Sequence, residues 1–110
     1  MSIPSDVRDD AEGALAEFCA QHSSEGVRYV HQFESNAALL LAERPGFMNQ
    51  SEWVSTPMAK FRYSQARNNW SLYWTDSSER WHRVSNAKAE KDIRALLDVV
   101  LKDPLGVFWS

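Results

Sequence analysis

The chain has 110 residues, 44% of them hydrophobic and 25% charged, with a net charge of -3 and a pI near 5.5. These values are typical of one globular domain with a single core. They do not favour a protein that binds nucleic acid or a membrane over its whole surface. The charge is unevenly spread, because residues 1–56 carry -6, residues 57–84 carry +3 and residues 85–110 carry no net charge.

The cysteine content and the start of the chain point to a cellular compartment. The single cysteine, Cys19, excludes an internal disulfide framework and fits a reducing environment. The first residues lack a basic run followed by an apolar one, and no apolar run approaches membrane-spanning length. We expect residues 1–110 to form one cytoplasmic domain that does not associate with a membrane.

Residues 5–22 carry the pattern of an amphipathic helix. Ser5 is a candidate N-cap, and acidic side chains follow it in the first turns, where the helix dipole favours them. The apolar stripe at helical spacing comprises Val7, Ala11, Leu15, Phe18, Cys19 and His22. We expect the helix to end near His22.

The spacing of apolar residues changes at residue 27 from the helical period to alternation, which predicts a hairpin. Its strands are residues 27–34 and 37–42, separated by the polar turn Ser35-Asn36. In this hairpin Arg28 can lie across from Glu43, so that opposite charges would pair between the strands.

Residues 44–53 form the least regular stretch of the sequence. Pro45 and Gly46 interrupt the strand pattern, and a polar run follows them. The stretch also contains the apolar residues Phe47, Met48 and Trp53. Because these side chains would be costly to expose, we expect the stretch to fold back over the sheet.

Three short runs rich in aromatic residues come next and predict a three-stranded antiparallel meander. The runs are 57–63, 70–74 and 80–84, and the polar segments between them have the length of hairpin loops. We pair Gln65 with Trp70 in the first hairpin and Thr75 with Arg80 in the second, and side chains then alternate between two faces. The face expected to meet the core carries Phe61, Tyr63, Trp70, Leu72, Trp74 and Trp81.

The opposite face of the meander is predicted to carry cations around an aromatic ring. Its candidate binding residues are Lys60, Arg62, Tyr73, Arg80 and His82, with the small polar residues Ser64, Ser71 and Thr75 between them. A one-residue slip in either hairpin would exchange the two faces. Such a slip is disfavoured because burying each large ring stabilises the fold by about 1.5–3 kcal/mol.

The last part of the chain predicts a second helix. Ser85 or Asn86 is the candidate cap, and the helix should end at Lys102 because Pro104 cannot continue it. Its apolar positions at helical spacing are Ala89, Ile93, Leu96, Leu97, Val100 and Leu101. We expect the apolar tail residues Val107, Phe108 and Trp109 to dock on the core.

The predicted order is therefore helix, five antiparallel strands and helix. The fold class is α+β, in which a hairpin and a three-stranded meander form one five-stranded antiparallel sheet. With both helices packed on its aromatic face, the chain forms a two-layer single domain.

Several runs of this sequence resemble the signature of a bacterial family of small domains of unknown function. These runs are Lys60-Phe-Arg-Tyr, Trp70-Ser-Leu-Tyr-Trp, Arg80-Trp-His-Arg and Asp103-Pro-Leu-Gly-Val-Phe-Trp. The likeness also covers Arg44-Pro45 and takes in most of residues 57–109. It supports the fold and implies no mechanism, since the family has no established activity.

Patterns typical of catalysis or metal binding are weak in this sequence. Only Cys19 and His22 stand close enough to begin a zinc site, and both lie in the apolar stripe of the first helix. The same position argues against Cys19 as an activated nucleophile. The four glycines lie far apart and form no phosphate-binding loop. We therefore expect neither a metal nor a cofactor and leave enzymatic activity uncertain.

Three classes of function remain open from the sequence. We favour a non-enzymatic protein-interaction or structural module, because the acidic front and basic meander could meet between chains or dock a protein partner. The alternative is single-stranded nucleic-acid binding. In that case Tyr73 would stack a base, Lys60, Arg62 and Arg80 would contact phosphates, and His82 would accept or donate a hydrogen bond. The second alternative is a small enzyme of unknown chemistry. Solvated cations on the wet face of a sheet would give the same pattern without any ligand.

Overall fold

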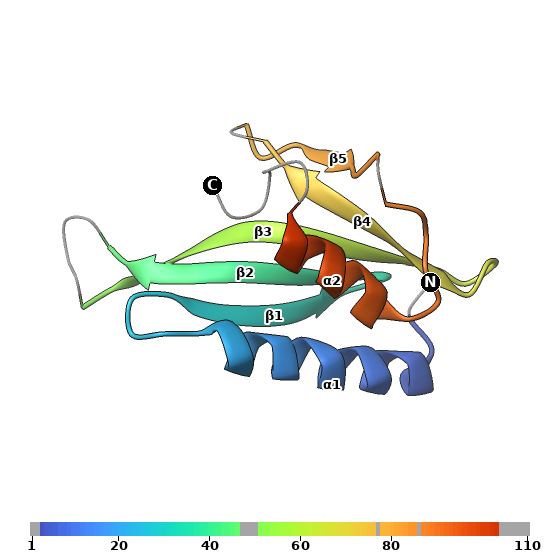
Figure 1. The fold of residues 1–110 in the computed structure, drawn as a ribbon, viewed down its shortest axis with the longest axis horizontal. Helices are drawn as coiled ribbons and strands as arrows, with labels where there is room; N and C mark the ends of the chain where they lie inside the picture. Colours follow the sequence, from blue (N-terminus) through green and yellow to red (C-terminus); the bar gives the residue numbers. More distant parts are fainter. Residues whose placement is uncertain (1–2, 47–50, 77, 86, 104–110) are drawn as a thin grey trace.

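A helix, five strands and a second helix follow one another along the chain, as Figure 1 shows. The computed structural model describes residues 3–46, 51–76, 78–85 and 87–103. The elements are α1 (Ser5–His22), β1 (Arg28–Glu34), β2 (Ala37–Pro45), β3 (Trp53–Ser64), β4 (Asn69–Thr75), β5 (Trp81–Arg83) and α2 (Ile93–Lys102). The strands form one antiparallel sheet in the order β1-β2-β3-β4-β5. The predicted α+β fold is confirmed.

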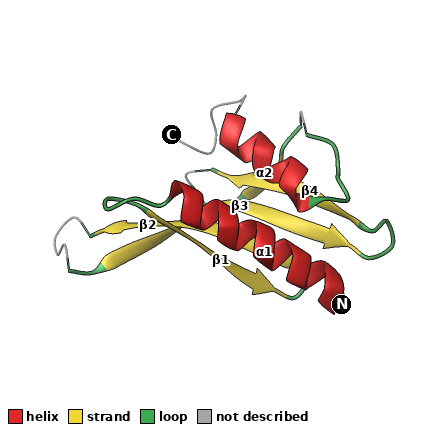
Figure 2. Ribbon diagram, turned by 60° about the horizontal axis from the view of Figure 1, so that its bottom comes forward, coloured by secondary structure: helices red, strands yellow, loops and turns green. Residues whose placement is uncertain are grey.

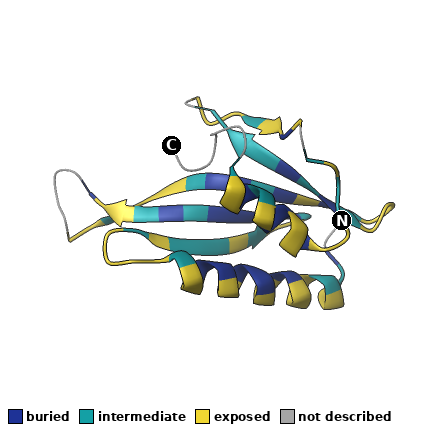
Figure 3. Cartoon of the chain, in the orientation of Figure 1, coloured by how far each residue is buried: buried dark blue, intermediate teal, exposed yellow. Residues whose placement is uncertain are grey.

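Both helices lie on the same face of the sheet, α1 across β1 and α2 across β3 and β4 (Figures 1 and 2). Buried residues gather on the inner side of α1 and along β2, β3 and β4 (Figure 3). The largest fully buried side chains are Trp70, Phe61, Leu15, Leu40, Leu72, Ile93, Leu96, Val84 and Val100. The helix face of the sheet is therefore the core side, and the face opposite the helices is called the outer face below.

The first hairpin has the predicted register. Arg28 lies opposite Glu43, and His31 lies opposite Leu40. The helix α1 ends at His22 as predicted, but Ser5 is not its cap. The cap position is Pro4, which has no side-chain donor or acceptor, and Ser5 is the first helical residue.

A β-bulge in β3 lets two consecutive residues face the core. Leu40 pairs with Ala59 and Leu41 pairs with Pro57, so Met58 is the extra residue. Met58 and Ala59 are both buried in the core cluster. A proline inside a strand is tolerated at such a bulge because it has no backbone N–H for the ladder.

The β3–β4 hairpin is shifted by two residues from the predicted pairing. Tyr63 pairs with Trp70 and Phe61 with Leu72, whereas we expected Tyr63 to meet Leu72. The strands continue to Ser64 and Asn69, which leaves a tight turn over residues 65–68. A shift of two residues preserves alternation, so every side chain of β3 and β4 stays on its predicted face.

The β4–β5 hairpin is shifted by one residue, which corrects the prediction for β5. Thr75 pairs with Trp81 and Trp74 with His82, so Trp81 faces outward and His82 faces the helix side. Asp76 explains the shift, because its Oδ1 accepts hydrogen bonds from the backbone N–H groups of Ser78 (2.8 Å) and Arg80 (3.1 Å). This Asx-type turn places residues 76–80 in the loop, one more residue than expected.

The segment between β5 and α2 is extended where we predicted helix. The backbone of Glu90 exchanges two hydrogen bonds with Trp70, of 2.9 and 2.7 Å. Helix α2 begins only at Ile93, and its cap is Asp92, whose carboxylate accepts a hydrogen bond from the backbone N–H of Arg94. Ser85 is therefore not the cap, and Asn86 lies outside the described residues.

Two expectations about apolar segments are only partly covered by the described residues. Trp53 lies at the start of β3, opposite Pro45, and the Arg28 guanidinium carbon is 3.5 Å from the centroid of a Trp53 ring. The expected packing of Phe47 and Met48 over the sheet and the docking of the tail residues 107–109 lie outside the described residues.

Replacing Trp70 with alanine should lower the free energy of unfolding by about 3–5 kcal/mol, because it leaves a cavity in the core. The Trp70 side chain is 1% exposed and packs on Tyr63, with ring centroids 5.0 Å apart. Trp81→Ala is the matched control and should cost no more than about 1 kcal/mol, since Trp81 lies on the outer face. Urea denaturation measures both. Equal losses would contradict the assignment of the two faces.

Candidate functional site: the outer face of the sheet

One continuous row of side chains crosses all five strands on the outer face. The registers align Gln32, Leu39, Lys60, Tyr73 and Arg83 as successive cross-strand partners. Residues paired across antiparallel strands point to the same face, with Cβ atoms about 4.5–5.5 Å apart. Lys60, Tyr73 and Arg83 therefore stand side by side at the β3–β5 end of the sheet.

A second row runs beside the first toward the β3–β4 turn. It aligns Glu34, Ala37, Arg62 and Ser71. On the other side of the first row, Trp81 lies diagonally from Tyr73, and the Lys60 ammonium is 5.8 Å from the centroid of a Trp81 ring. Two aromatic rings and three cations thus share one region, which we call the basic aromatic patch: Lys60, Arg62, Tyr73, Trp81 and Arg83.

The predicted binding residues are only partly brought together. Lys60, Arg62 and Tyr73 lie on the outer face, as alternation indicated. His82 is on the helix face opposite Trp74, and Arg80 belongs to the loop before β5. Trp81 and Arg83 take their places on the patch. Sequence reasoning missed these two residues, although Asp76 with Ser78 two positions later is a turn signal that could have revealed the longer loop.

The cations of the patch have no acidic partner among the described residues. Arg94, by contrast, pairs with Asp10 at 3.1 Å and with Asp92 at 3.3 Å, which raises the pKa of its guanidinium. Lys102 likewise pairs with Asp98 at 3.0 Å. The positive charges of Arg94 and Lys102 on α2 are therefore compensated locally, whereas those of Lys60, Arg62 and Arg83 are available to attract an anion.

A hollow of about 410 Å³ lies at the turn end of the patch. Its polar lining includes Asn36, Arg62, Ser64, Gln65, Ser71 and Tyr73. These side chains supply a guanidinium, hydroxyls and amides, all of which can donate hydrogen bonds. Of the described residues that line the hollow, none is acidic, so its chemistry suits an anion.

Comparison with known families assigns the chain to a family. A family described as "Domain of unknown function (DUF3024)" matches residues 3–110. The chain belongs to the DUF3024 family. The match includes the N-terminal helix, which the resemblance in sequence did not cover. No curated protein matches the chain, and no solved structure does so either.

The loop before β5 of this DUF3024 domain is held by a carboxylate. Asp76 Oδ2 lies 2.7 Å from Nε2 of His82, while its Oδ1 accepts the two backbone hydrogen bonds of the loop. The bond from His82 is the largest cause that lowers the pKa of Asp76, followed by that from Arg80. His82 also packs on Trp74, with ring centroids 4.8 Å apart. Asp76 thereby fixes the register that turns Trp81 outward.

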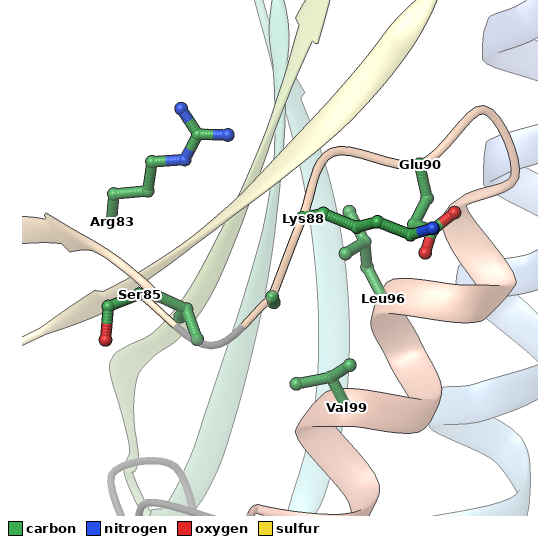
Figure 4. Close-up of a pocket in the computed structure, with 8 residues that line it drawn as sticks. Arg83, Ser85, Lys88, Glu90, Leu96 and Val99 are labelled. Atoms are coloured by element: carbon green, nitrogen blue, oxygen red, sulfur yellow. The ribbon is translucent and has the colours of Figure 1, made fainter.

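A hollow of about 800 Å³ in the DUF3024 domain lies beside α2 and is less suited to a polar ligand (Figure 4). Its floor is apolar and includes Val84, Leu96 and Val99. Figure 4 shows the Arg83 guanidinium directed away from the floor and the Lys88 side chain extended toward Glu90. Charged groups therefore do not converge on a common point in this hollow.

The other residues weighed from the sequence have structural positions. Cys19 is 7% exposed, and burial raises the pKa of its thiol to about 11. His22 packs on Phe18, with ring centroids 4.5 Å apart. Within the described ranges no group of three or more His, Cys, Asp or Glu side chains is placed to hold a metal. The described helices also include none long and apolar enough to cross a membrane.

Asp76→Asn should flatten the loss of stability in acid. The pKa of Asp76 is lowered in the folded protein, so its carboxylate stabilises the fold above the unfolded-state pKa, and this contribution disappears as the pH falls below about 4. Urea unfolding between pH 7 and pH 2 measures the effect. Asp9→Asn, at an exposed position of α1, is the control and should keep the parental slope. An unchanged slope in Asp76→Asn would contradict the role of this carboxylate.

The Cys19 thiol should react slowly with a disulfide reagent in the native protein. With a pKa of about 11, very little thiolate is present at pH 8, and the side chain is buried. Labelling should become fast in concentrated urea, where the pKa and the exposure return to ordinary values. Equal rates in the two conditions would show that Cys19 is accessible and activated.

Proposed function

We propose that this protein binds single-stranded nucleic acid through the basic aromatic patch. The observation that carries the proposal is the common location of two aromatic rings, Tyr73 and Trp81, with three cations that have no acidic partner among the described residues. Single-strand binders combine these two elements, since rings stack bases while lysine and arginine neutralise phosphates.

The dimensions of the sheet suit a short, unpaired strand. Neighbouring strands lie about 4.8 Å apart, so the distance from β3 to β5 is about 10 Å, which suits a short segment of nucleic acid. Flat stacking on Tyr73 and Trp81 requires bases that are free of a duplex. Among the described residues, no helix or protruding ribbon lies on this face that could enter a groove of double-stranded DNA.

The charge distribution supports a ligand confined to this face. The outer-face strand positions hold four cations, Arg28, Lys60, Arg62 and Arg83, and two acids, Glu34 and Glu43. They sum to +2 in a chain whose net charge is -3. A polyanion would therefore be attracted to the outer face and repelled by most of the remaining surface.

A protein-interaction module is the second candidate, and one observation favours it. An apolar strip on the outer face next to Lys60 comprises Val30 and Leu41, which are half-buried, and Leu39, which is buried. Tryptophan, tyrosine and arginine are also the residues that dominate the energetics of protein interfaces. Lys60 at the centre of the surface weighs against this candidate, because lysine is depleted in the cores of protein interfaces.

The proposal includes a cellular location. We place the protein in the cytoplasm, where a single buried thiol such as Cys19 stays reduced and single-stranded RNA is available. No bond-making step is assigned to the patch, because its residues are suited to stacking and to charge neutralisation.

A variant with Lys60→Gln, Arg62→Gln and Arg83→Gln should lose binding to a short fluorescent oligonucleotide of U or dT. Fluorescence anisotropy at several salt concentrations measures it. For the parent, three phosphate contacts predict a slope of log K against log salt of about -2. Any residual binding of the variant should show a slope close to zero, and the variant should retain the parental unfolding midpoint, since these side chains lie outside the core.

The matched control removes three exposed cations elsewhere, by Arg67→Gln, Lys88→Gln and Lys91→Gln. It has the same net charge as the patch variant and should retain most of the affinity. If both variants lose the same affinity, the effect comes from the net charge of the protein and not from the basic aromatic patch. If the parent binds no oligonucleotide even at low salt, the nucleic-acid proposal fails and the protein-interaction candidate takes its place.

A further inference from the structure

We propose that the hollow beside Arg62 binds the terminal phosphate of a bound single-stranded nucleic acid. The protein would then prefer nucleic acids with a phosphorylated end. This inference rests on the proposed function and adds a specific ligand chemistry to it. The ligand group is a phosphate monoester, which at neutral pH carries more negative charge and one more acceptor oxygen than the diester within a chain.

The donor groups of the hollow match such a group. Arg62 contributes a guanidinium whose planar fork suits phosphate oxygens. Ser71 is its direct cross-strand partner on β4, and Tyr73 lines the same hollow. With Ser64, Asn36 and Gln65 around them, all of the polar side chains that line it can donate hydrogen bonds. A monoester has enough acceptor oxygens to use several of these donors at once.

The position of the hollow favours the end of a strand over its middle. It lies where the outer face meets the β3–β4 turn, and Gln65 and Ala66 of that turn form part of its wall. Glu34 occupies the same row as Arg62, two strands away toward β1. A chain that runs from Trp81 past Tyr73 therefore meets a wall and then a carboxylate, and both oppose its continuation.

The positions of the aromatic rings also indicate where the terminal nucleotide and the next one would lie on the outer face. Tyr73 contributes to both the basic aromatic patch and the hollow. A terminal phosphate in the hollow would bring its nucleoside to Tyr73 and the next one toward Trp81 and Lys60. Arg62 would then contact the terminal group, whereas Lys60 and Arg83 would contact the internal phosphates.

The experiment compares four-nucleotide oligomers of U with a 5′-phosphate, with a 3′-phosphate and with neither. Each is titrated into the parent, into Arg62→Gln and into the control Arg67→Gln. Arg67 is an exposed residue of the β3–β4 turn. One phosphorylated form should bind the parent about tenfold more tightly than the unphosphorylated oligomer. The gain should shrink to about twofold in Arg62→Gln and persist in Arg67→Gln. The oligomer that shows the gain, with a 5′- or a 3′-phosphate, identifies which end of the nucleic acid the hollow binds.

The outcomes separate this inference from the proposed function. If all three oligomers bind the parent equally, the preference for ends is wrong while single-strand binding stands. A gain that survives Arg62→Gln also overturns it, because another site would hold the phosphate. If no oligomer binds, an NMR titration with inorganic phosphate decides the matter. Shifts of the Arg62 and Ser71 amides that are lost in Arg62→Gln support the anion site, and unchanged amides refute it.

Discussion

The burial of Trp70 is the constraint on which the rest of the structure depends. Its ring lies in the core between the sheet and the helices, and it packs on Tyr63. Its backbone pairs with Tyr63 on one side and with Glu90 on the other. The same residue therefore holds the meander, the extended return segment and the approach to α2 in register. With both helices on this face, the outer face remains for side chains that the core does not use.

Two local irregularities decide which side chains reach the outer face. The bulge at Met58 lets two successive residues enter the core and leaves Lys60 outward. The loop closed by Asp76 adds one residue between β4 and β5, and it thereby turns Trp81 outward and His82 inward. Neither feature belongs to the patch itself. The chemistry of the outer face thus depends on backbone geometry that is set a few residues away.

Much of this arrangement could be predicted from the sequence, and the failures have a common cause. Alternation in β3 and β4 is strong because one face is aromatic, so even a pairing error of two residues left Lys60, Arg62 and Tyr73 on the correct face. In β5 the order Trp-His-Arg does not alternate between apolar and polar residues. The number of residues in the loop before β5 therefore decides which of its side chains face outward. The start of α2 was missed for a related reason. Ala89 lies at helical spacing from Ile93, but the pairing of Glu90 with Trp70 requires an extended backbone.

Because the two faces are separate, residues of the patch can be substituted with less effect on folding than residues of the core. On the helix face, a change in volume is opposed by close packing around Phe61, Leu72 and Trp70. On the outer face, Lys60 and Arg83 contribute little to that packing, so their substitution changes the electrostatic field with little effect on folding. A few outer-face positions can therefore change the charge of the patch while the fold is preserved. Asp76 is the exception, because this loop residue fixes the orientation of Trp81 and so couples the stability of the hairpin to the shape of the patch.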